Sequence, residues 1–315
     1  MSIFISVVLV VVLALAACWL WTRKLAAGAE QAVPQAGEIL PVTGGTIHYT
    51  DTGPRDGQPL VLIHGLAGNM HNFTYALVEQ LSADFRVITI DRPGSGYSTR
   101  TDGALAELPA QADMISEFLA KLGVENPVLV GHSLGGALAL AMVLQNRQPI
   151  GALALLCPLT AVIPQPPAVF KPLVIRFPVM RRLIGHTIAA PITRMTSETV
   201  VARIFAPEKV PDDFMVKGGG VLGLRPKSFI GASNDLHGVT ASMPAQQARY
   251  ATEIAVPGGI LFGADDRLLS PDLHGAVLQA HGLVYETLPG RGHMIPVTAP
   301  EACAEFIRRM AAMAR

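Results

Sequence analysis

The sequence predicts an α/β protein in which a mostly parallel sheet is covered by helices on both faces. Short apolar runs alternate with longer segments of helical periodicity along residues 38–315, and this alternation is typical of parallel sheets. A Gly-x-Ser-x-Gly segment at 131–135 lies between one such run and a helical segment. A separate apolar stretch, residues 3–21, precedes all of these elements.

The formal charges of the chain balance, with 24 Lys and Arg residues against 24 Asp and Glu residues. A nucleic-acid-binding protein needs a basic face to neutralise phosphates, so no nucleic-acid partner is expected. The three cysteines, Cys18, Cys157 and Cys303, are far apart and lack the spacing of a metal site or a disulfide scaffold.

The apolar stretch at residues 3–21 contains Ser6 as its only polar residue. A membrane span needs about 20 apolar residues. Trp19 and Trp21 close the stretch, where an aromatic belt would lie, and Arg23 and Lys24 follow. Residues 1–24 are therefore predicted to be a single-pass membrane anchor. The two basic residues favour a cytoplasmic location for the folded domain that follows.

Two other interpretations of this N-terminal segment stay open. Residues 15–18, Leu-Ala-Ala-Cys, resemble a lipobox, which would make the chain a lipoprotein lipidated at Cys18. A cleaved secretory signal is the other alternative. Both normally begin with a basic region, which this sequence lacks. Residues 25–37 are small, polar and Pro-containing, and they predict a linker to the folded domain.

The folded domain is expected to begin with two strands at 38–43 and 46–51, because Gly44-Gly45 between them is a hairpin signal. Short apolar runs bounded by Gly, Pro or Asp predict the buried parallel strands that follow. These strands are expected at 59–63, 87–90, 128–130, 150–156, 259–262 and 283–288. Helices are expected between and after them at 73–81, 110–122, 134–145 and 300–313.

The strand pattern is interrupted between residues 158 and 256. This region holds several prolines and helical segments near 179–188 and 196–204. Because the sheet pattern resumes afterwards, the region is predicted to be a mainly helical cap inserted into the domain. The core would then consist of residues 38–157 and 257–315.

Ser133 is the candidate nucleophile. It is the centre of Gly131-His132-Ser133-Leu134-Gly135, which follows the apolar run at 128–130 and precedes a helical segment. This strand–turn–helix context is that of a nucleophile elbow, in which a sharp turn exposes the serine at the carboxyl end of the sheet.

A serine hydroxyl needs a base, and the base needs a carboxylate that fixes its tautomer. His293 follows the last predicted strand, within Gly290-Arg291-Gly292-His293. Asp265 and Asp266 follow the strand at 259–262. Neighbouring side chains on a strand point in opposite directions, so only one of these two carboxylates can face His293.

Several motifs together resemble the α/β-hydrolase superfamily over roughly residues 38–315. They are His64-Gly65, residues 91–98 (Asp-Arg-Pro-Gly-Ser-Gly-Tyr-Ser), the elbow, residues 263–266 and Gly292-His293. The resemblance implies that Asp266, three residues after Gly263, is the acid. It also implies an oxyanion hole formed by the backbone N–H groups of Leu66 and Leu134.

The resemblance implies a serine hydrolase that cleaves carboxylic esters through an acyl-enzyme, with no cofactor or metal. The apolar cap and the anchor favour a small-molecule ester with an apolar acyl group, such as a monoacylglycerol. The alternatives are a carbon–carbon bond hydrolase, a perhydrolase, or a non-catalytic membrane-anchored binding protein. Apolar cap residues predicted to form an acyl pocket include Val169, Phe170, Val174, Ile175, Phe177 and Met180.

Overall fold

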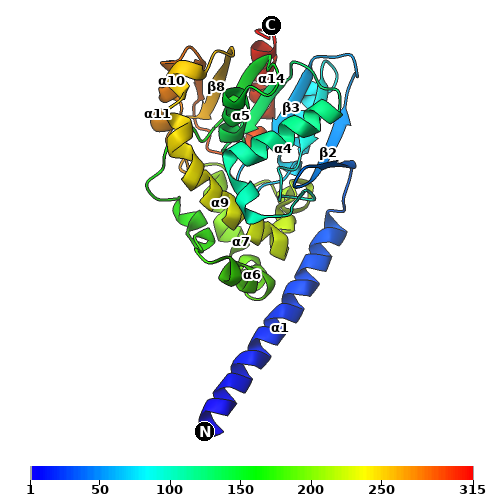
Figure 1. The fold of residues 1–315 in the computed structure, drawn as a ribbon, viewed down its shortest axis with the longest axis vertical. Helices are drawn as coiled ribbons and strands as arrows, with labels where there is room; N and C mark the ends of the chain where they lie inside the picture. The colour runs from blue at the N-terminus through cyan, green and yellow to red at the C-terminus, as the bar shows by residue number, and fades with distance from the viewer. Residues whose placement is uncertain (1, 315) are drawn as a thin grey trace.

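A nine-stranded sheet forms the centre of the computed structural model, which describes residues 2–314 (Figure 1). The strands are β1 (Glu38–Val42), β2 (Gly45–Thr52), β3 (Pro59–Ile63), β4 (Arg86–Ile90), β5 (Thr99–Arg100), β6 (Val128–His132), β7 (Ala152–Leu156), β8 (Gly258–Gly263) and β9 (Val284–Leu288). Their order is β1-β2-β4-β3-β6-β7-β8-β9, with β5 paired to β2. The pairs from β4 to β9 are parallel, and β2 is antiparallel to its neighbours. The predicted mostly parallel sheet is confirmed.

The core helices range from 4 to 14 residues in length. They are α2 (His71–Thr74), α3 (Leu77–Leu81), η1 (Gly103–Ala106), α4 (Leu108–Lys121), α5 (Leu134–Gln145), α10 (Tyr250–Glu253), α11 (Pro271–His274), α12 (Ala276–Gln279), α13 (Ile295–Thr298) and α14 (Pro300–Ala311). Helix α5 is almost completely buried beside β6, which explains why its sequence is apolar on every side. Helix α4 packs on α5, whereas α14 packs on α3 and β7.

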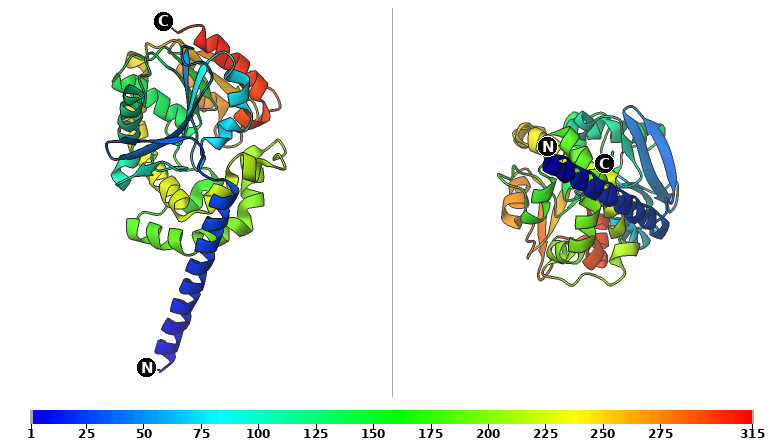
Figure 2. Two further views of the ribbon diagram at one scale, coloured as in Figure 1. Left: turned by 90° about the vertical axis from the view of Figure 1, so that its right-hand side faces the viewer. Right: turned by 90° about the horizontal axis from the view of Figure 1, so that it is seen from below.

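The cap lies over the carboxyl ends of the strands (Figures 1 and 2). Residues 158–257, all described, fold into helical elements that separate β7 from β8. The cap elements are η2 (Ala168–Leu173), α6 (Pro178–His186), α7 (Ala189–Phe205), α8 (Phe214–Lys217), η3 (Gly220–Leu224) and α9 (Pro226–Gln247), and α10 then leads back to β8 in the core. The insertion therefore covers the sheet edge at which Ser133 would be exposed.

Helix α1 (Ser2–Ala32) projects from the body of the molecule on the side of the cap (Figure 2). Its apolar part has a mean hydropathy of 3.0 and is not buried. The structure differs from the expected linker at 25–37, because the helix continues as far as Ala32. Alanine is the strongest helix former, and Ala29 and Val33 are buried against the rest of the protein. Only the last few residues of the expected linker are irregular.

Candidate active site

Ser133 occupies the sharp turn between β6 and α5, with backbone angles φ 55° and ψ −121°. This conformation is strained for a residue with a side chain, and it persists only where the surroundings enforce it. The Ser133 N–H donates to the Leu156 carbonyl at 3.1 Å, and its carbonyl accepts from Gly136 N–H at 2.9 Å. These bonds hold the turn between β7 and the first turn of α5.

The glycines around Ser133 are required by close backbone contacts. A β-carbon on Gly135 would lie 1.9 Å from the Ile63 carbonyl oxygen, and one on Gly131 would lie 2.6 Å from the Gly135 oxygen. A β-carbon on Gly65 would lie 2.8 Å from Cβ of Ser133. Larger residues at these positions would displace the strand, the helix or the serine itself.

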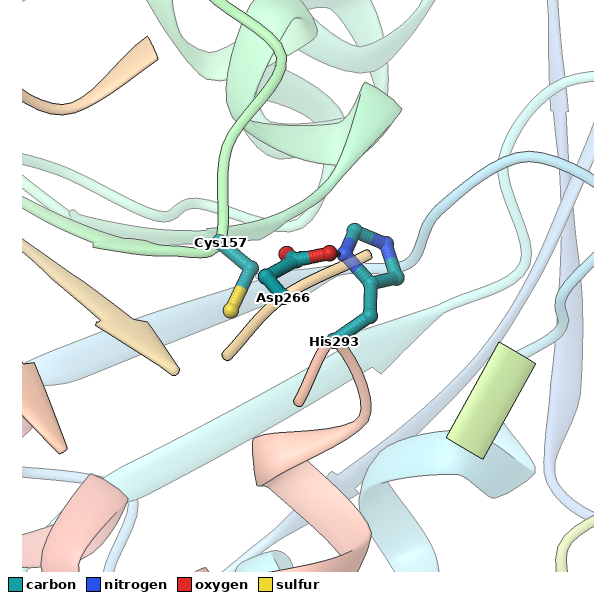
Figure 3. A group of neighbouring side chains, drawn as sticks. All are labelled: Cys157, Asp266 and His293. Atoms are coloured by element: carbon teal, nitrogen blue, oxygen red, sulfur yellow. Dashed lines mark hydrogen bonds and ion pairs between the residues drawn. The ribbon is translucent and has the colours of Figure 1, made fainter. Parts of the chain in front are cut away.

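His293 and Asp266 form a buried pair beside this turn (Figure 3). His293 Nδ1 lies 2.7 Å from Asp266 Oδ2. The other carboxylate oxygen accepts the N–H groups of Leu268 and Leu269 at 2.8 and 3.0 Å. Because an ionised carboxylate can only accept, Nδ1 donates in this contact, which in the neutral ring places the lone pair on Nε2.

The pKa of Asp266 lies below its usual value although burial alone would raise it, because the charge and hydrogen bond of His293 outweigh burial. The backbone N–H groups of Leu269 and Leu268 add to the effect. Asp265, by contrast, has an exposed side chain. Of the two candidate carboxylates, the structure brings only Asp266 to His293.

Cys157 lies next to this pair, and the three ligand atoms fall within 4.8 Å of one another. Burial raises the pKa of the Cys157 thiol well above its usual value, so the thiolate that a metal requires is disfavoured. Both oxygens of Asp266 already accept hydrogen bonds. This donor set fits a proton-transfer pair better than a metal site.

Ser133 and His293 line one cavity of about 130 Å³, together with Leu66 and Leu134. Leu134 is the first residue of α5, so its N–H has no acceptor within the helix. The other residues that line the cavity are mostly apolar: Leu159, Ala161, Val162, Ile163, Pro164, Pro166, Pro167, Phe170, Leu236, Val239, Thr240, Met243, Leu268 and Leu269.

The cavity wall differs from the predicted acyl pocket. Of the six apolar cap residues named from the sequence, only Phe170 lines the cavity. Val174, Phe177 and Met180 are exposed instead, because the chain turns away from the site after η2. Helix α9 also lines the cavity, although it was not predicted to do so; its residues 236, 239, 240 and 243 have the spacing of a single helix face.

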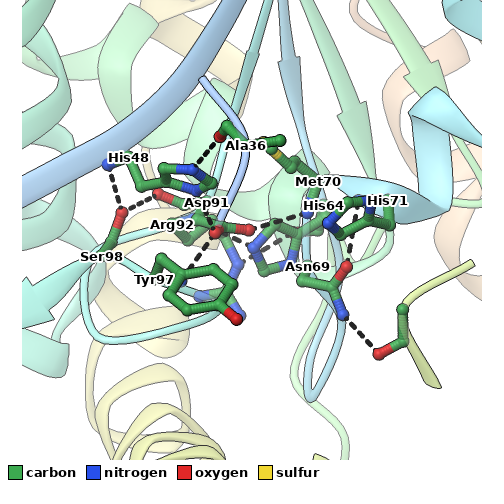
Figure 4. Close-up of polar contacts among 12 residues, drawn as sticks. Ala36, His48, His64, Asn69, Met70, His71, Asp91, Arg92, Tyr97 and Ser98 are labelled. Carbon is green, nitrogen blue, oxygen red and sulfur yellow. Dashed lines mark hydrogen bonds and ion pairs between the residues drawn. The ribbon is translucent and has the colours of Figure 1, made fainter. Parts of the chain in front are cut away.

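Residues 91–98, which connect β4 to β5, form a structural brace (Figure 4). The Asp91 carboxylate lies 2.7 Å from His48 Nδ1 and accepts the N–H groups of Met70 and Tyr97 at 2.8 and 2.7 Å. Arg92 is fully buried and donates to the carbonyl oxygens of His64 and Gly65 at 2.8 and 3.0 Å. The loop therefore supports the His-Gly segment from behind and does not line the cavity.

His132 contacts the backbone of the segment that carries His293. Its Nε2 lies 3.0 Å from the His293 carbonyl oxygen. Burial lowers the pKa of His132 to about 3, with the neighbouring His293 as the second cause. The neutral His132 ring therefore donates from Nε2 and fixes the distance between the elbow and the loop that carries His293.

The strand–turn–helix geometry at Ser133 and the sheet order define an α/β fold of the hydrolase class. The family model for the alpha/beta hydrolase fold matches residues 58–182. The chain is 30% identical to the magnesium-chelatase 30 kDa subunit of Rhodobacter capsulatus, over 67% of this chain and 83% of that protein. The chain belongs to the α/β-hydrolase fold family.

Two further similarities bear on this assignment. A 97-residue segment, 30% of this chain, is 38% identical to an sn-1-specific diacylglycerol lipase of Xenopus tropicalis and covers 29% of that lipase. The structure resembles the enol-lactonase of Burkholderia xenovorans, with a TM-score of 0.71 and 20% identity. That match covers 87% of this chain and all of the lactonase. The family membership supports hydrolase activity in general.

Proposed function

We propose that the protein hydrolyses carboxylic esters through an acyl-enzyme. Ser133 is the nucleophile, His293 is the general base, and Asp266 orients the base. The observation that supports this proposal most directly is the 2.7 Å contact between His293 and Asp266 at a cavity that Ser133 also lines. Nδ1 is committed to the carboxylate, which leaves Nε2 to take the serine proton.

The reaction divides into acylation and deacylation. Ser133 attacks the ester carbonyl while His293 takes its proton and passes it to the leaving alcohol. The backbone N–H groups of Leu66 and Leu134 would stabilise the oxyanion, and one such donor contributes about 10²–10³ in rate. Water, activated by His293, then releases the acid and restores the serine.

The apolar wall of the cavity supports an acyl ester of apolar chain as substrate. Each buried CH₂ contributes about 0.8 kcal/mol, close to fourfold in binding. With p-nitrophenyl esters, kcat/KM is therefore expected to rise from acetate to medium chains and then to level off when the cavity is full. A steady decline from acetate upwards would contradict an apolar acyl site.

The same experiment separates ester hydrolysis from other reactions of this triad. A panel that adds vinylogous diketones and an assay of peracid formation from hydrogen peroxide tests the carbon–carbon bond hydrolase and perhydrolase alternatives. Activity confined to the diketones or to peracid formation would replace the ester proposal and keep the triad.

Helix α1 is proposed to be an uncleaved single-pass anchor, since its apolar part is long enough to span a bilayer and is not buried. The basic pair Arg23 and Lys24 supports a cytoplasmic catalytic domain. The full chain should then resist carbonate extraction and keep its N-terminal residues by mass spectrometry. A mature chain that starts at lipidated Cys18 would support the lipoprotein alternative.

A second candidate is a non-catalytic, membrane-anchored subunit. The similarity to a protein named as a subunit, the magnesium-chelatase 30 kDa subunit of Rhodobacter capsulatus, favours the subunit role alone, and it extends over 67% of this chain. A fluorophosphonate probe distinguishes the two candidates. Labelling of the wild-type protein but not of the Ser133→Ala variant supports the hydrolase, and a wild-type protein that the probe fails to label supports the subunit.

A further inference from the structure

The first half of the cap carries an exposed apolar surface, which we call the cap apolar face. Its residues lie in and around η2, α6 and the first two turns of α7, and their exposed fractions run from 44% to 76%. They are Val174, Phe177, Val179, Met180, Leu183, Ile192 and Met195. Exposed apolar side chains gathered within one short segment, residues 174–195, point to an interaction surface.

Helix α1 leaves the body directly beside this face (Figures 1 and 2). Thr22 is fully buried, and its hydroxyl donates to the Thr187 carbonyl oxygen at 2.5 Å. Thr187 directly follows α6 and lies two residues before the start of α7, and α1 packs on both of these helices. The junction of α6 and α7 is therefore held at the carboxyl end of the apolar part of α1.

This contact fixes the depth of the face relative to a membrane. A span of about 20 residues that begins at Ile3 ends close to Thr22. The helices that meet Thr22 then lie at the level of the lipid headgroups. Helix α14 and the C-terminus lie at the opposite end of the molecule from the N-terminus of α1 (Figure 1).

The charges around the face match an anionic lipid surface. Residues 158–197 contain five Lys and Arg residues and no Asp or Glu, although the whole chain is neutral. Four of these cations, at Lys171, Arg176, Arg182 and Arg194, are exposed. Long cationic side chains reach the headgroups while their stems and apolar neighbours contact acyl chains.

We infer that the cap apolar face inserts into the headgroup region of an anionic bilayer, beside the α1 span. The inference rests on the proposal that α1 is a membrane anchor. A second copy of the chain is the less suitable occupant, because a symmetric pair would bring the same cations together without a counter-charge. Insertion would also bring the cavity wall near lipid, since residues 162–170 precede the face directly.

The test uses the full-length chain in vesicles of phosphatidylcholine with phosphatidylglycerol. An environment-sensitive fluorophore is attached to Val179→Cys or Met195→Cys in a Cys18→Ser background; Cys157 and Cys303 are buried. Glu125→Cys, on the exposed loop before β6, is the control. The two face labels should shift to the blue and be quenched by lipids brominated on their acyl chains, whereas the control label should not.

A matched pair of charge variants tests the lipid selectivity. The double variant Arg176→Gln and Arg182→Gln should abolish the increase in quenching that phosphatidylglycerol causes for the fluorophore attached at Val179→Cys. Arg55→Gln with Arg147→Gln removes two exposed cations elsewhere and should leave that increase unchanged. Equal quenching with and without phosphatidylglycerol in the wild-type background would overturn the anionic selectivity.

Carbonate extraction separates this inference from the anchor proposal. Face labels that remain unquenched in a carbonate-resistant protein would overturn the inference and leave the anchor intact. Labels shielded from aqueous iodide but not quenched by lipid would assign the face to another protein surface and also overturn it. If the face labels are quenched in a protein that carbonate extracts, the result would support insertion of the cap apolar face and overturn the proposal that α1 is an anchor.

Discussion

At the scale of single residues, the conformation of Ser133 is held by the protein and not by its own preference. Replacing Ser133 or His293 with Ala removes the proposed nucleophile or base but leaves the backbone of the turn in place. Each change should lower kcat by about 10⁴–10⁶, and the double variant should lose little more, because the two groups act as a unit. Ester hydrolysis measured beside thermal melting checks this, and substantial activity of Ser133→Ala would contradict it.

The two neighbouring aspartates provide a matched comparison. Asp266→Asn keeps the shape of the side chain but removes the acceptor that fixes the His293 tautomer, so kcat should fall about 10⁴-fold. Asp265→Asn changes an exposed group and should have a small effect. The ratio of the two kcat values decides the assignment, and a larger loss in Asp265→Asn would transfer the role of the acid to that residue.

The positions of the proposed triad could be predicted because each member follows a strand that the sequence marks clearly. The cavity wall could not be predicted in the same way. Val174 and Phe170 are close in the chain and equally apolar, yet one is exposed and the other lines the cavity. That difference depends on how η2 packs on α9, which the apolar pattern of a short segment does not specify.

At the scale of elements, a buried ion-pair cluster joins the cap to the core. Asp235 on α9 contacts Arg92 at 2.9 Å and Arg100 at 2.5 Å, and all three side chains are nearly inaccessible. Asp235→Asn would leave two buried guanidinium groups without a counter-charge. The free energy of unfolding should fall by about 3–5 kcal/mol.

The control for this prediction is the ion pair of Asp113 with Arg147, in which both side chains are about half exposed. Asp113→Asn should change the unfolding free energy by less than about 1 kcal/mol, because solvent screens such a pair. Chemical denaturation of both variants in the same detergent provides the measurement. Similar stabilities would show that the cap is held without this cluster.

The elements themselves could largely be predicted from periodicity, with one instructive difference. The expected linker at 25–37 is mostly helical because its alanines favour helix and because α1 packs on the cap, with Ala29 buried. The helix propensity of this segment could be predicted from the sequence, but the surface on which the segment packs could not. The continuous helix couples the orientation of the cap to that of α1.

Three buried histidines make the free energy of unfolding of the protein depend on pH. Burial is the largest cause that lowers the pKa of His64 and His132 to about 3 and that of His274 to about 4. In the unfolded chain a histidine takes up a proton near pH 6.5. Between these values the unfolded state binds more protons than the folded state, so the stabilising contribution is complete above pH 6.5 and declines as the pH falls.

This linkage predicts a loss of about 2 kcal/mol for each of the three histidines between pH 7 and pH 5. Most carboxylates remain ionised over that range, so the histidines should dominate the slope. Urea unfolding at several pH values gives the number of protons taken up, which should be at least about three near pH 5, since burial also lowers the pKa of His71. In His132→Gln that number should fall by about one, because the side-chain amide nitrogen of Gln can take the place of Nε2 and donate to the His293 carbonyl but cannot titrate. A flat profile from pH 7 to pH 5 would mean that these rings are charged in the folded protein.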